Sequence, residues 1–148
     1  MIVRFELLGQ PFAKQSFRFA QMRSKTGKSF MVKYQPKKVK DGERNLRAQI
    51  IQQLPESFIP FNDRVRVVTC HFKFCPPKSF SKKIQEAISL GELVPKLTKP
   101  DLTDNLMKGL FDAMKGIVFS DDSIIWSVEG VRKFYSHRPG IDLVLEGK

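Results

Sequence analysis

A cluster of carboxylates lies within an otherwise basic chain, and its residue types suggest phosphodiester chemistry. The chain has 148 residues and a formal net charge of +11, so it should attract polyanions such as nucleic acids. The segment KPDLTDNLMK at 99–108 and the loop SDDS at 120–123 hold aspartates that would repel such a polyanion. A divalent ion such as Mg²⁺, bound between carboxylates and a phosphate, would remove this repulsion. The combination favours an enzyme that cuts or transfers phosphodiesters.

Four residues of the acidic segment are candidates for this chemistry. Asp101, Asp104 and Asp122 carry the carboxylate oxygens that Mg²⁺ prefers as ligands. Lys108 lies one helical turn beyond Asp104, where its ammonium group could support the charge of a transition state. The candidate helix between these acids spans roughly 20 Å. Spacing alone therefore does not bring Asp122 to Asp101 and Asp104, and a returning segment or a second protomer would have to do so.

Each of these residues also has a structural interpretation. Asp101 and Asp104 could cap a helix and offset its dipole. An Asp-Asp pair such as 121–122 is common in turns. Lys108 could form a solvated ion pair with Asp112, four residues further along the helix. The case for catalysis therefore rests on the combination of residues.

Hydrophobic periodicity predicts one α+β domain over residues 1–148 to position these side chains. We expect strands at 2–8, 64–75, 124–135 and 141–146, and helices at 41–54, 81–90 and 103–115. A hairpin is expected between 17–23 and 29–34, with a tip at 24–28 in which Gly27 can take positive φ. No apolar run is long enough to span a bilayer, and two cysteines do not make a disulfide scaffold. We expect an intracellular, cytoplasmic protein without a membrane partner.

The positive charge is concentrated in the first third of the chain. Residues 1–50 hold 12 of the 26 Lys and Arg residues but only 3 of the 15 Asp and Glu residues. Aromatic residues are interleaved with these cations, which favours nucleic acid as the partner. The predicted contacts to DNA phosphates come from a basic hairpin region at about 14–38, and they are Lys14, Arg18, Arg23, Lys25, Lys28, Lys33, Lys37 and Lys38.

At 99–108, followed by LFD at 110–112 and DDS at 121–123, the chain resembles the RusA-type Holliday-junction resolvases. The motif of that family runs Lys/Arg-Pro-Asp, one residue, Asp-Asn, two residues, Lys, then Asp-Ala-Leu and later Asp-Asp-Ser/Ala-Gln. The segment GQPFAK at 9–14 with Arg18 and Phe19, and the segment YQPKK at 34–38, extend the resemblance over nearly the whole chain.

The resemblance implies a homodimeric crossover junction endodeoxyribonuclease with a mixed β-sheet packed with helices and an acidic catalytic segment at about 99–123. Such enzymes nick four-way DNA junctions in symmetric pairs during recombination and repair. They use Mg²⁺, with Mn²⁺ as a substitute, and no small-molecule cofactor. They occur in phages and prophages. The essential residues of the family are three aspartates and a lysine, which match Asp101, Asp104, Asp122 and Lys108.

The chain departs from the family pattern at several positions. Two residues, Leu102 and Thr103, separate Asp101 from Asp104, where the family usually has one. On a strand the extra residue would turn Asp101 to the other face, whereas a bulge or an early helical turn would restore it. Ile124 stands where the family often has Gln, and 16–17 is Ser-Phe where relatives often carry Arg-Pro. Two other functions remain open, a non-catalytic branched-DNA-binding protein and a nuclease selective for forks or flaps.

Overall fold

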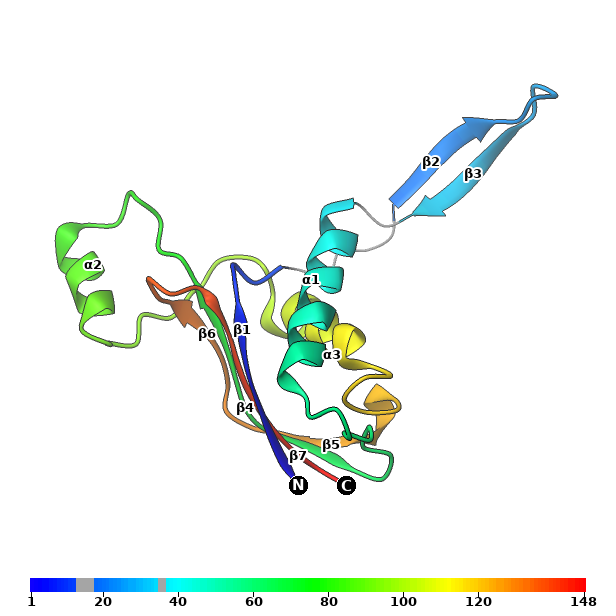
Figure 1. The fold of residues 1–148 in the computed structure, drawn as a ribbon. Coiled ribbons are helices and arrows are strands. Elements are labelled where there is room, and N and C mark those ends of the chain that lie inside the picture. Colours follow the sequence, from blue (N-terminus) through cyan, green and yellow to red (C-terminus); the bar gives the residue numbers. More distant parts are fainter. Residues whose placement is uncertain (13–17, 35–36) are drawn as a thin grey trace.

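Alternating apolar residues build a five-stranded mixed sheet. Strand β1 (Ile2–Leu8) pairs antiparallel with β7 (Gly140–Gly147), which pairs antiparallel with β4 (Val65–Phe74). Strands β5 (Ile125–Val128) and β6 (Val131–Tyr135) both lie parallel to β4 (Figure 1). This computed structural model describes residues 1–12, 18–34 and 37–148, with only the backbone of Arg18 and Phe19. The strands expected at 2–8, 64–75 and 141–146 are confirmed.

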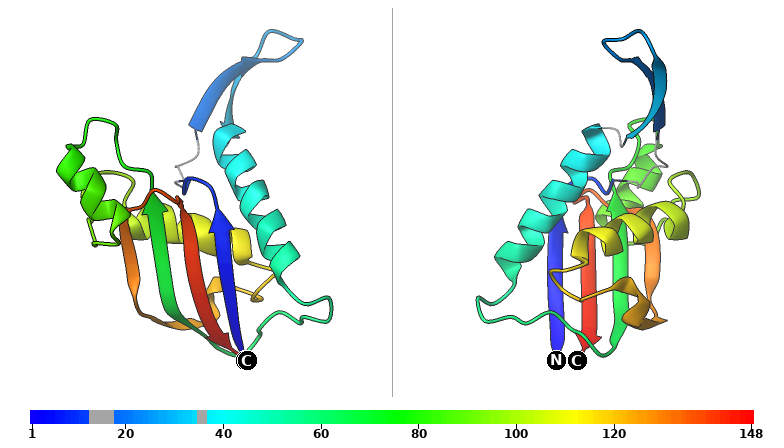
Figure 2. Two further views of the ribbon diagram at one scale, coloured as in Figure 1. Left: turned by 60° about the vertical axis from the view of Figure 1, so that its left-hand side comes forward. Right: turned by 90° about the vertical axis from the view of Figure 1, so that its right-hand side faces the viewer.

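Helices α1 (Lys37–Gln53) and α3 (Lys108–Met114) cover the same face of the sheet (Figure 2). The buried residues Leu46 and Ile50 of α1 and Leu110 of α3 form one hydrophobic core with the sheet. Helix α2 (Lys82–Ser89) lies at one end of the sheet and begins at Ser81, whose hydroxyl accepts the Ile84 N–H as expected of a cap. The result is a single compact α+β domain, as predicted. None of the helices in the described parts of the chain has the length and hydrophobicity needed to cross a membrane.

Helix α1 begins at Lys37, four residues before the predicted start at 41. Its first turn contains lysines and no acidic residue, which is unfavourable for the helix dipole and hid the start from sequence signals. Gly42 lies inside this helix because a Cβ there would come within 2.8 Å of the Phe12 ring. The Phe12 side chain therefore packs closely against the start of α1.

The strand expected at 124–135 is wrong in extent, because it divides into β5 and β6. Gly130 separates them with a positive φ of 54°. A Cβ at Gly130 would lie 2.8 Å from the carbonyl oxygen of Val68, so a larger residue would displace the backbone of β4. The break allows both short strands to pair with β4. The pairing of β4 with its neighbours is irregular near Val67.

The uncovered face of the sheet carries ion pairs that join β4 to β7 and to the connection between β5 and β6. Lys73 lies 3.0 Å from Asp142, and Arg66 lies 2.8 Å from Glu129 and 3.4 Å from Glu146. Exposed pairs of this kind contribute little to stability, but they make the face compatible with water. On the opposite face, burial of Cys70 raises the pKa of its thiol to about 12, which keeps it neutral within the core.

Strands β2 (Arg18–Arg23) and β3 (Ser29–Tyr34) form the predicted hairpin as a separate two-stranded sheet. It projects away from the sheet and helices of the main body (Figures 1 and 2). Its tip is closed by hydrogen bonds from the Ser24 N–H to the Lys28 carbonyl (2.8 Å) and from the Gly27 N–H to the Ser24 carbonyl (3.0 Å). Gly27 takes the expected positive φ, 82°.

Two glutamines of α1 occupy the free edge of β1. Gln53 accepts a hydrogen bond from the Glu6 N–H and donates one to the Glu6 carbonyl, both at 2.9 Å. Gln49 does the same for Leu8, at 2.7 and 3.0 Å. Because Gln49 and Gln53 are four residues apart, one face of the helix supplies both amides. An edge strand with unpaired backbone groups can pair with a strand of another molecule. The two amides occupy these backbone groups from within the same chain.

Replacing both Gln49 and Gln53 with Ala should lower the free energy of unfolding by about 2–6 kcal/mol, because it removes four hydrogen bonds that contribute roughly 0.5–1.5 kcal/mol each. The variant should also associate at high concentration through its exposed edge. Urea unfolding and light scattering measure the two effects. Gln52→Ala, an exposed glutamine on the same helix, is the matched control. A double variant that matches this control in both measurements would contradict the role assigned to the amides.

Candidate active site and DNA-binding surface

The acidic motif begins in a π-helix, η1 (Leu102–Met107), which continues directly into α3. The Leu106 N–H donates to the Asp101 carbonyl at 3.1 Å, a hydrogen bond that spans five residues. A π-turn holds more residues than an α-helical turn. The extra residue between Asp101 and Asp104 is therefore taken up within the helix. The early helical turn considered for this segment is observed, and the expected helix at 103–115 has a π-helical first half.

Helix capping does not account for Asp101. Its side chain makes no capping hydrogen bond. Instead, the Asp101 N–H donates to the side-chain oxygen of Asn105 at 3.2 Å. Asp101 and Asp104 are both exposed. Exposed carboxylates at the start of a helix, the first of which makes no capping hydrogen bond, are suited to binding a cation or a proton-donating group.

Lys108 is exposed at the start of α3, on the turn after Asp104. The expected ion pair between Lys108 and Asp112 is absent from the ion pairs that the described residues form with one another. Asp112 instead lies near Lys115, three residues further along the helix, and contributes to raising the pKa of that lysine. The ammonium group of Lys108 is thus available to a substrate.

The two acids of the loop at 120–123 have different environments. Asp121 forms an ion pair with Lys115 and accepts the Ser123 N–H at 3.0 Å. The bond with Lys115, followed by the bond with Ser123, holds the pKa of Asp121 well below its usual range. Asp121 therefore fixes the loop against the end of α3. Asp122, the first residue of the 3₁₀ turn η2 (Asp122–Ile124), is exposed and is the acid of the pair that can face a substrate.

Lys115 is a residue that sequence reasoning did not identify. Its pKa is raised by its hydrogen bond to Asp121 and then by the charges of Asp121, Asp122 and Asp112. The contact exists because the chain turns back after α3, with the Gly116 N–H donating to the Phe119 carbonyl at 2.7 Å. The spacing of Lys115 from Asp112, one helical turn, was the only signal in the sequence, and it does not reveal the loop contact.

The structure does not bring the three candidate metal ligands together. In residues 1–12, 18–34 and 37–148, no group of three or more His, Cys, Asp or Glu side chains is placed to hold a metal ion. Asp122 lies near Lys115 at the end of α3, whereas Asp101 and Asp104 lie at the start of η1. The donor atoms suit a hard divalent ion, but one chain does not assemble them into a complete site.

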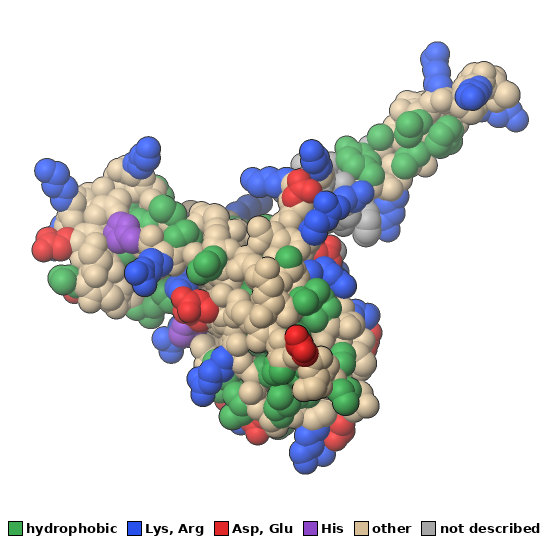
Figure 3. Space-filling model, viewed as in Figure 1, with side chains coloured by type: hydrophobic (Ala, Val, Ile, Leu, Met, Phe, Trp, Pro, Cys, Tyr) green, Lys and Arg blue, Asp and Glu red, His purple; other side chains and the backbone are tan. Residues whose placement is uncertain are grey.

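The predicted DNA contacts lie mainly on the projecting hairpin. Arg23, Lys25 and Lys28 are exposed around its tip, and Lys33 is exposed on β3 (Figure 3). Lys37 and Lys38 are exposed in the first turn of α1, where the positive end of the helix dipole adds to their attraction for phosphate. Lys14 lies outside the described residues, and so does the side chain of Arg18. The described cations thus make up a basic surface in two parts, one on the hairpin and one at the start of α1.

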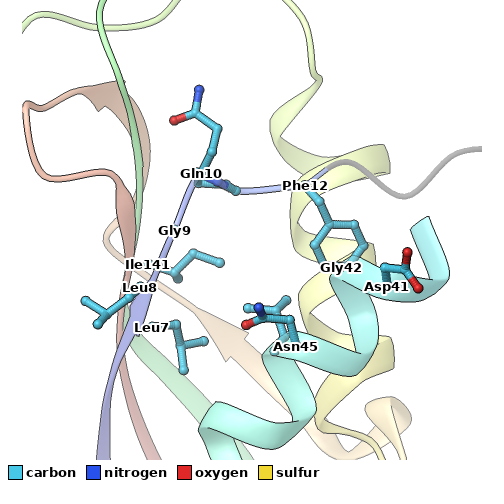
Figure 4. Close-up of a pocket in the computed structure, with 11 residues that line it drawn as sticks. Leu7, Leu8, Gly9, Gln10, Phe12, Asp41, Gly42, Asn45 and Ile141 are labelled. Atoms are coloured by element: carbon cyan, nitrogen blue, oxygen red, sulfur yellow. The ribbon is translucent and has the colours of Figure 1, made fainter. Parts of the chain in front are cut away.

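A cavity of about 330 Å³ lies between the end of β1 and the first turns of α1 (Figure 4). Its lining is mainly apolar and includes Leu7, Phe12 and Ile141, with Asn45 and Asp41 on the helix side. None of the four candidate catalytic residues lines it. The cavity is therefore separate from the acidic motif.

The ion pair between Lys115 and Asp121 predicts a pH dependence of stability. Because the folded-state pKa of Asp121 is lowered from 3.8, its contribution is complete above that value and is lost as the pH falls below it. The wild type should thus be more stable than Asp121→Asn at pH 6, and the difference should shrink progressively as the pH falls below 3.8. Urea unfolding across this range measures it. Asp63→Asn, an exposed acid with a longer 3.5 Å pair, should show a much smaller change. A difference at Asp121 that does not vary with pH would contradict the assignment.

Comparisons with known proteins agree with the residue motif. The model of the family described as endodeoxyribonuclease RusA matches residues 9–146. An uncharacterized protein of Bacillus subtilis (strain 168), YqaN, is 32% identical over 148 residues, which cover 97% of this chain and 94% of that protein. RusA-family nucleases resolve Holliday junctions and generally depend on a divalent metal. The extent of these matches shows that the chain belongs to the RusA endodeoxyribonuclease family.

Proposed function

We propose that this protein is a homodimeric, Mg²⁺-dependent crossover junction endodeoxyribonuclease that resolves four-way DNA junctions by paired symmetric nicks. It would act in DNA recombination and repair in the cytoplasm of a bacterial cell, encoded by a phage or prophage. The observation that carries the proposal is the segment Asp101–Lys108, which matches the family motif apart from one extra residue and exposes the side chains of Asp101, Asp104 and Lys108. Mn²⁺ would substitute for Mg²⁺.

In this proposal Asp104 and Asp122 hold the ion and Asp101 helps to hold it. When bound, the ion would neutralise charge on the scissile phosphate and lower the pKa of a water molecule. Lys108 would stabilise the negative charge that develops on the phosphate oxygens during cleavage. Lys115 would keep the loop of Asp122 in place through its pair with Asp121. Each of these roles belongs to a side chain on or beside the η1–α3 helix.

We propose that a second copy of the chain completes the site. The acids at the start of η1 and the acid of the loop do not form a three-ligand group within one chain. A two-fold dimer presents two copies of each segment, so the loop of one copy can approach the helix start of the other. A four-way junction offers two equivalent strands to such a dimer, which accounts for paired cuts.

The first test is incubation of the protein with an end-labelled mobile four-way junction in Mg²⁺ and in EDTA. Paired symmetric nicks that appear only with Mg²⁺ support the proposal. Tight binding without nicks in Mg²⁺ or Mn²⁺ would favour a branched-DNA-binding protein, which is consistent with the incomplete site of the single chain. Equal or faster cleavage of forks and flaps in the same assay would favour a nuclease of different selectivity.

Replacing Asp104 with Asn should reduce junction cleavage by at least about a thousandfold, because the amide keeps the shape but loses the charge that holds the ion. Junction affinity should stay within about twofold, since the basic surface is unchanged. Cleavage and gel-shift assays measure the two effects. Asp63→Asn, which changes an exposed acid near β4 in the same way, should cleave normally. Loss of binding in Asp104→Asn would contradict the separation of the basic surface from the acidic site.

A shared site predicts complementation between two inactive variants. Mixed dimers of Asp104→Asn and Asp122→Asn chains would hold one site with both defects and one site with none. Mixing should therefore restore single nicks in one strand, where the separate variants give none. Denaturing gels of the labelled junction measure these nicks. If each chain carried its own site, every site in the mixed dimer would be defective and no nicks would return.

A further inference from the structure

The β2–β3 hairpin has one mainly apolar face and one mixed face that carries most of its strand cations. Ala20 pairs with Val32 and Met22 pairs with Phe30, and residues directly opposite in a strand pair share a face. Tyr34, two residues beyond Val32, lies on the same face. On the reverse face Arg23 pairs with Ser29, Gln21 pairs with Met31, and Lys33 pairs with Phe19. The ribbon is therefore amphipathic in the manner of a strand that covers a core.

No core lies beneath the apolar face of this hairpin within the described part of the chain. Met22, Phe30 and Tyr34 are 50%, 47% and 40% exposed. Apolar side chains lie in a row along the projecting hairpin (Figure 3). A two-stranded hairpin by itself is marginally stable in water, and a row of exposed large apolar residues marks an interaction surface. A partner that covers this face is thus expected.

Charge determines the kind of partner. Residues 18–34 contain five Lys and Arg residues and no Asp or Glu: Arg18, Arg23, Lys25, Lys28 and Lys33. Two such hairpins placed face to face would bring two sets of cations together without a counter-charge. DNA combines negative phosphates with the flat apolar faces of its bases. The hairpin carries cations at its tip and on its reverse face, and these complement the phosphates. The aromatic and thioether groups on its apolar face complement the base faces.

We propose that the apolar face of the hairpin docks against unstacked base pairs at the open centre of branched DNA. Met22, Phe30 and Tyr34 contact the bases, while Arg23, Lys25, Lys28 and Lys33 contact the adjoining phosphates. In continuous duplex the base faces are stacked on one another and closed to this surface. The hairpin thereby distinguishes a junction from a duplex, whereas its cations bind both. The inference rests on the proposed function for its substrate class, and it assigns junction selectivity to residues outside the acidic site.

The test compares Phe30→Thr and Met22→Thr/Phe30→Thr with Met31→Thr. Threonine preserves strand propensity, and Met31 is an apolar residue on the reverse face that is 63% exposed. Each protein is titrated in EDTA with a four-way junction carrying 2-aminopurine at the branch point and with a duplex of the same sequence. Circular dichroism verifies the fold, and sedimentation measures the oligomeric state.

The two apolar-face variants should lose at least about tenfold in junction affinity and show a smaller rise in 2-aminopurine fluorescence, because base stacking on an aromatic side chain is lost. Duplex affinity should be unchanged, Met31→Thr should behave as wild type, and Phe30→Trp should retain selectivity. Wild-type protein without junction preference, or unchanged selectivity in Phe30→Thr, would overturn the proposal. A change of oligomeric state that accounts for the lost affinity would also overturn it and assign the face to a second copy.

Binding in EDTA does not require cleavage, so this test separates the inference from the proposed enzyme activity. If the wild type shows no Mg²⁺-dependent nicks but Phe30→Thr loses selectivity, the nuclease proposal fails and the docking surface stands. If the wild type resolves junctions and the apolar-face variants bind them equally well, the docking surface alone fails.

Discussion

The packing of the η1–α3 helix on the sheet is the constraint on which the rest of the site depends. Leu106, Leu110, Ala113 and Met114 are at most 1% exposed, and burial of a large apolar side chain contributes about 1.5–3 kcal/mol. This anchored stripe fixes the rotation of the helix about its axis. Asp104 and Lys108 are consequently directed to solvent, and the end of α3 is held where Lys115 meets the returning loop.

The π-helical start reconciles this anchored stripe with the extra residue of the motif. In an α-helix each residue advances the chain by about 100° around the axis, so an added residue would rotate every position upstream of it. The bond from the Leu106 N–H to the Asp101 carbonyl encloses the added residue in a wider turn. Leu106 stays buried, and the change in spacing is confined to the residues between Asp101 and Asp104. One short segment can then supply both the buried Leu106 of the core and the exposed acids of the motif.

Local sequence patterns predicted most of the helices and strands. Contacts between segments that are distant in the sequence determined where β5 and β6 divide and which residues surround the candidate site. Alternation identified β1, β4 and β7, and the SKTGK tip identified the hairpin. The division at Gly130 was missed because it depends on the nearby Val68 carbonyl, and the early start of α1 was missed because its lysines resemble a loop. The residue motif indicated Asp101, Asp104, Lys108 and Asp122 as candidate site residues. It could not show that Lys115 engages Asp121, since that contact requires the chain to turn back after Gly116.

The separation of charges in space explains how one small basic protein can carry an acidic site. The hairpin has no carboxylate among residues 18–34, and its cations lie on a ribbon that projects from the body (Figure 3). The candidate catalytic acids lie on the main body of the domain, at the start of η1 and in the loop after α3. Since interactions between exposed charges are largely screened beyond roughly 10 Å at 0.1 M salt, cations on the hairpin can hold DNA without neutralising distant acids. The acids keep their charge for a divalent ion, and salt should weaken DNA binding more than it weakens the ion site.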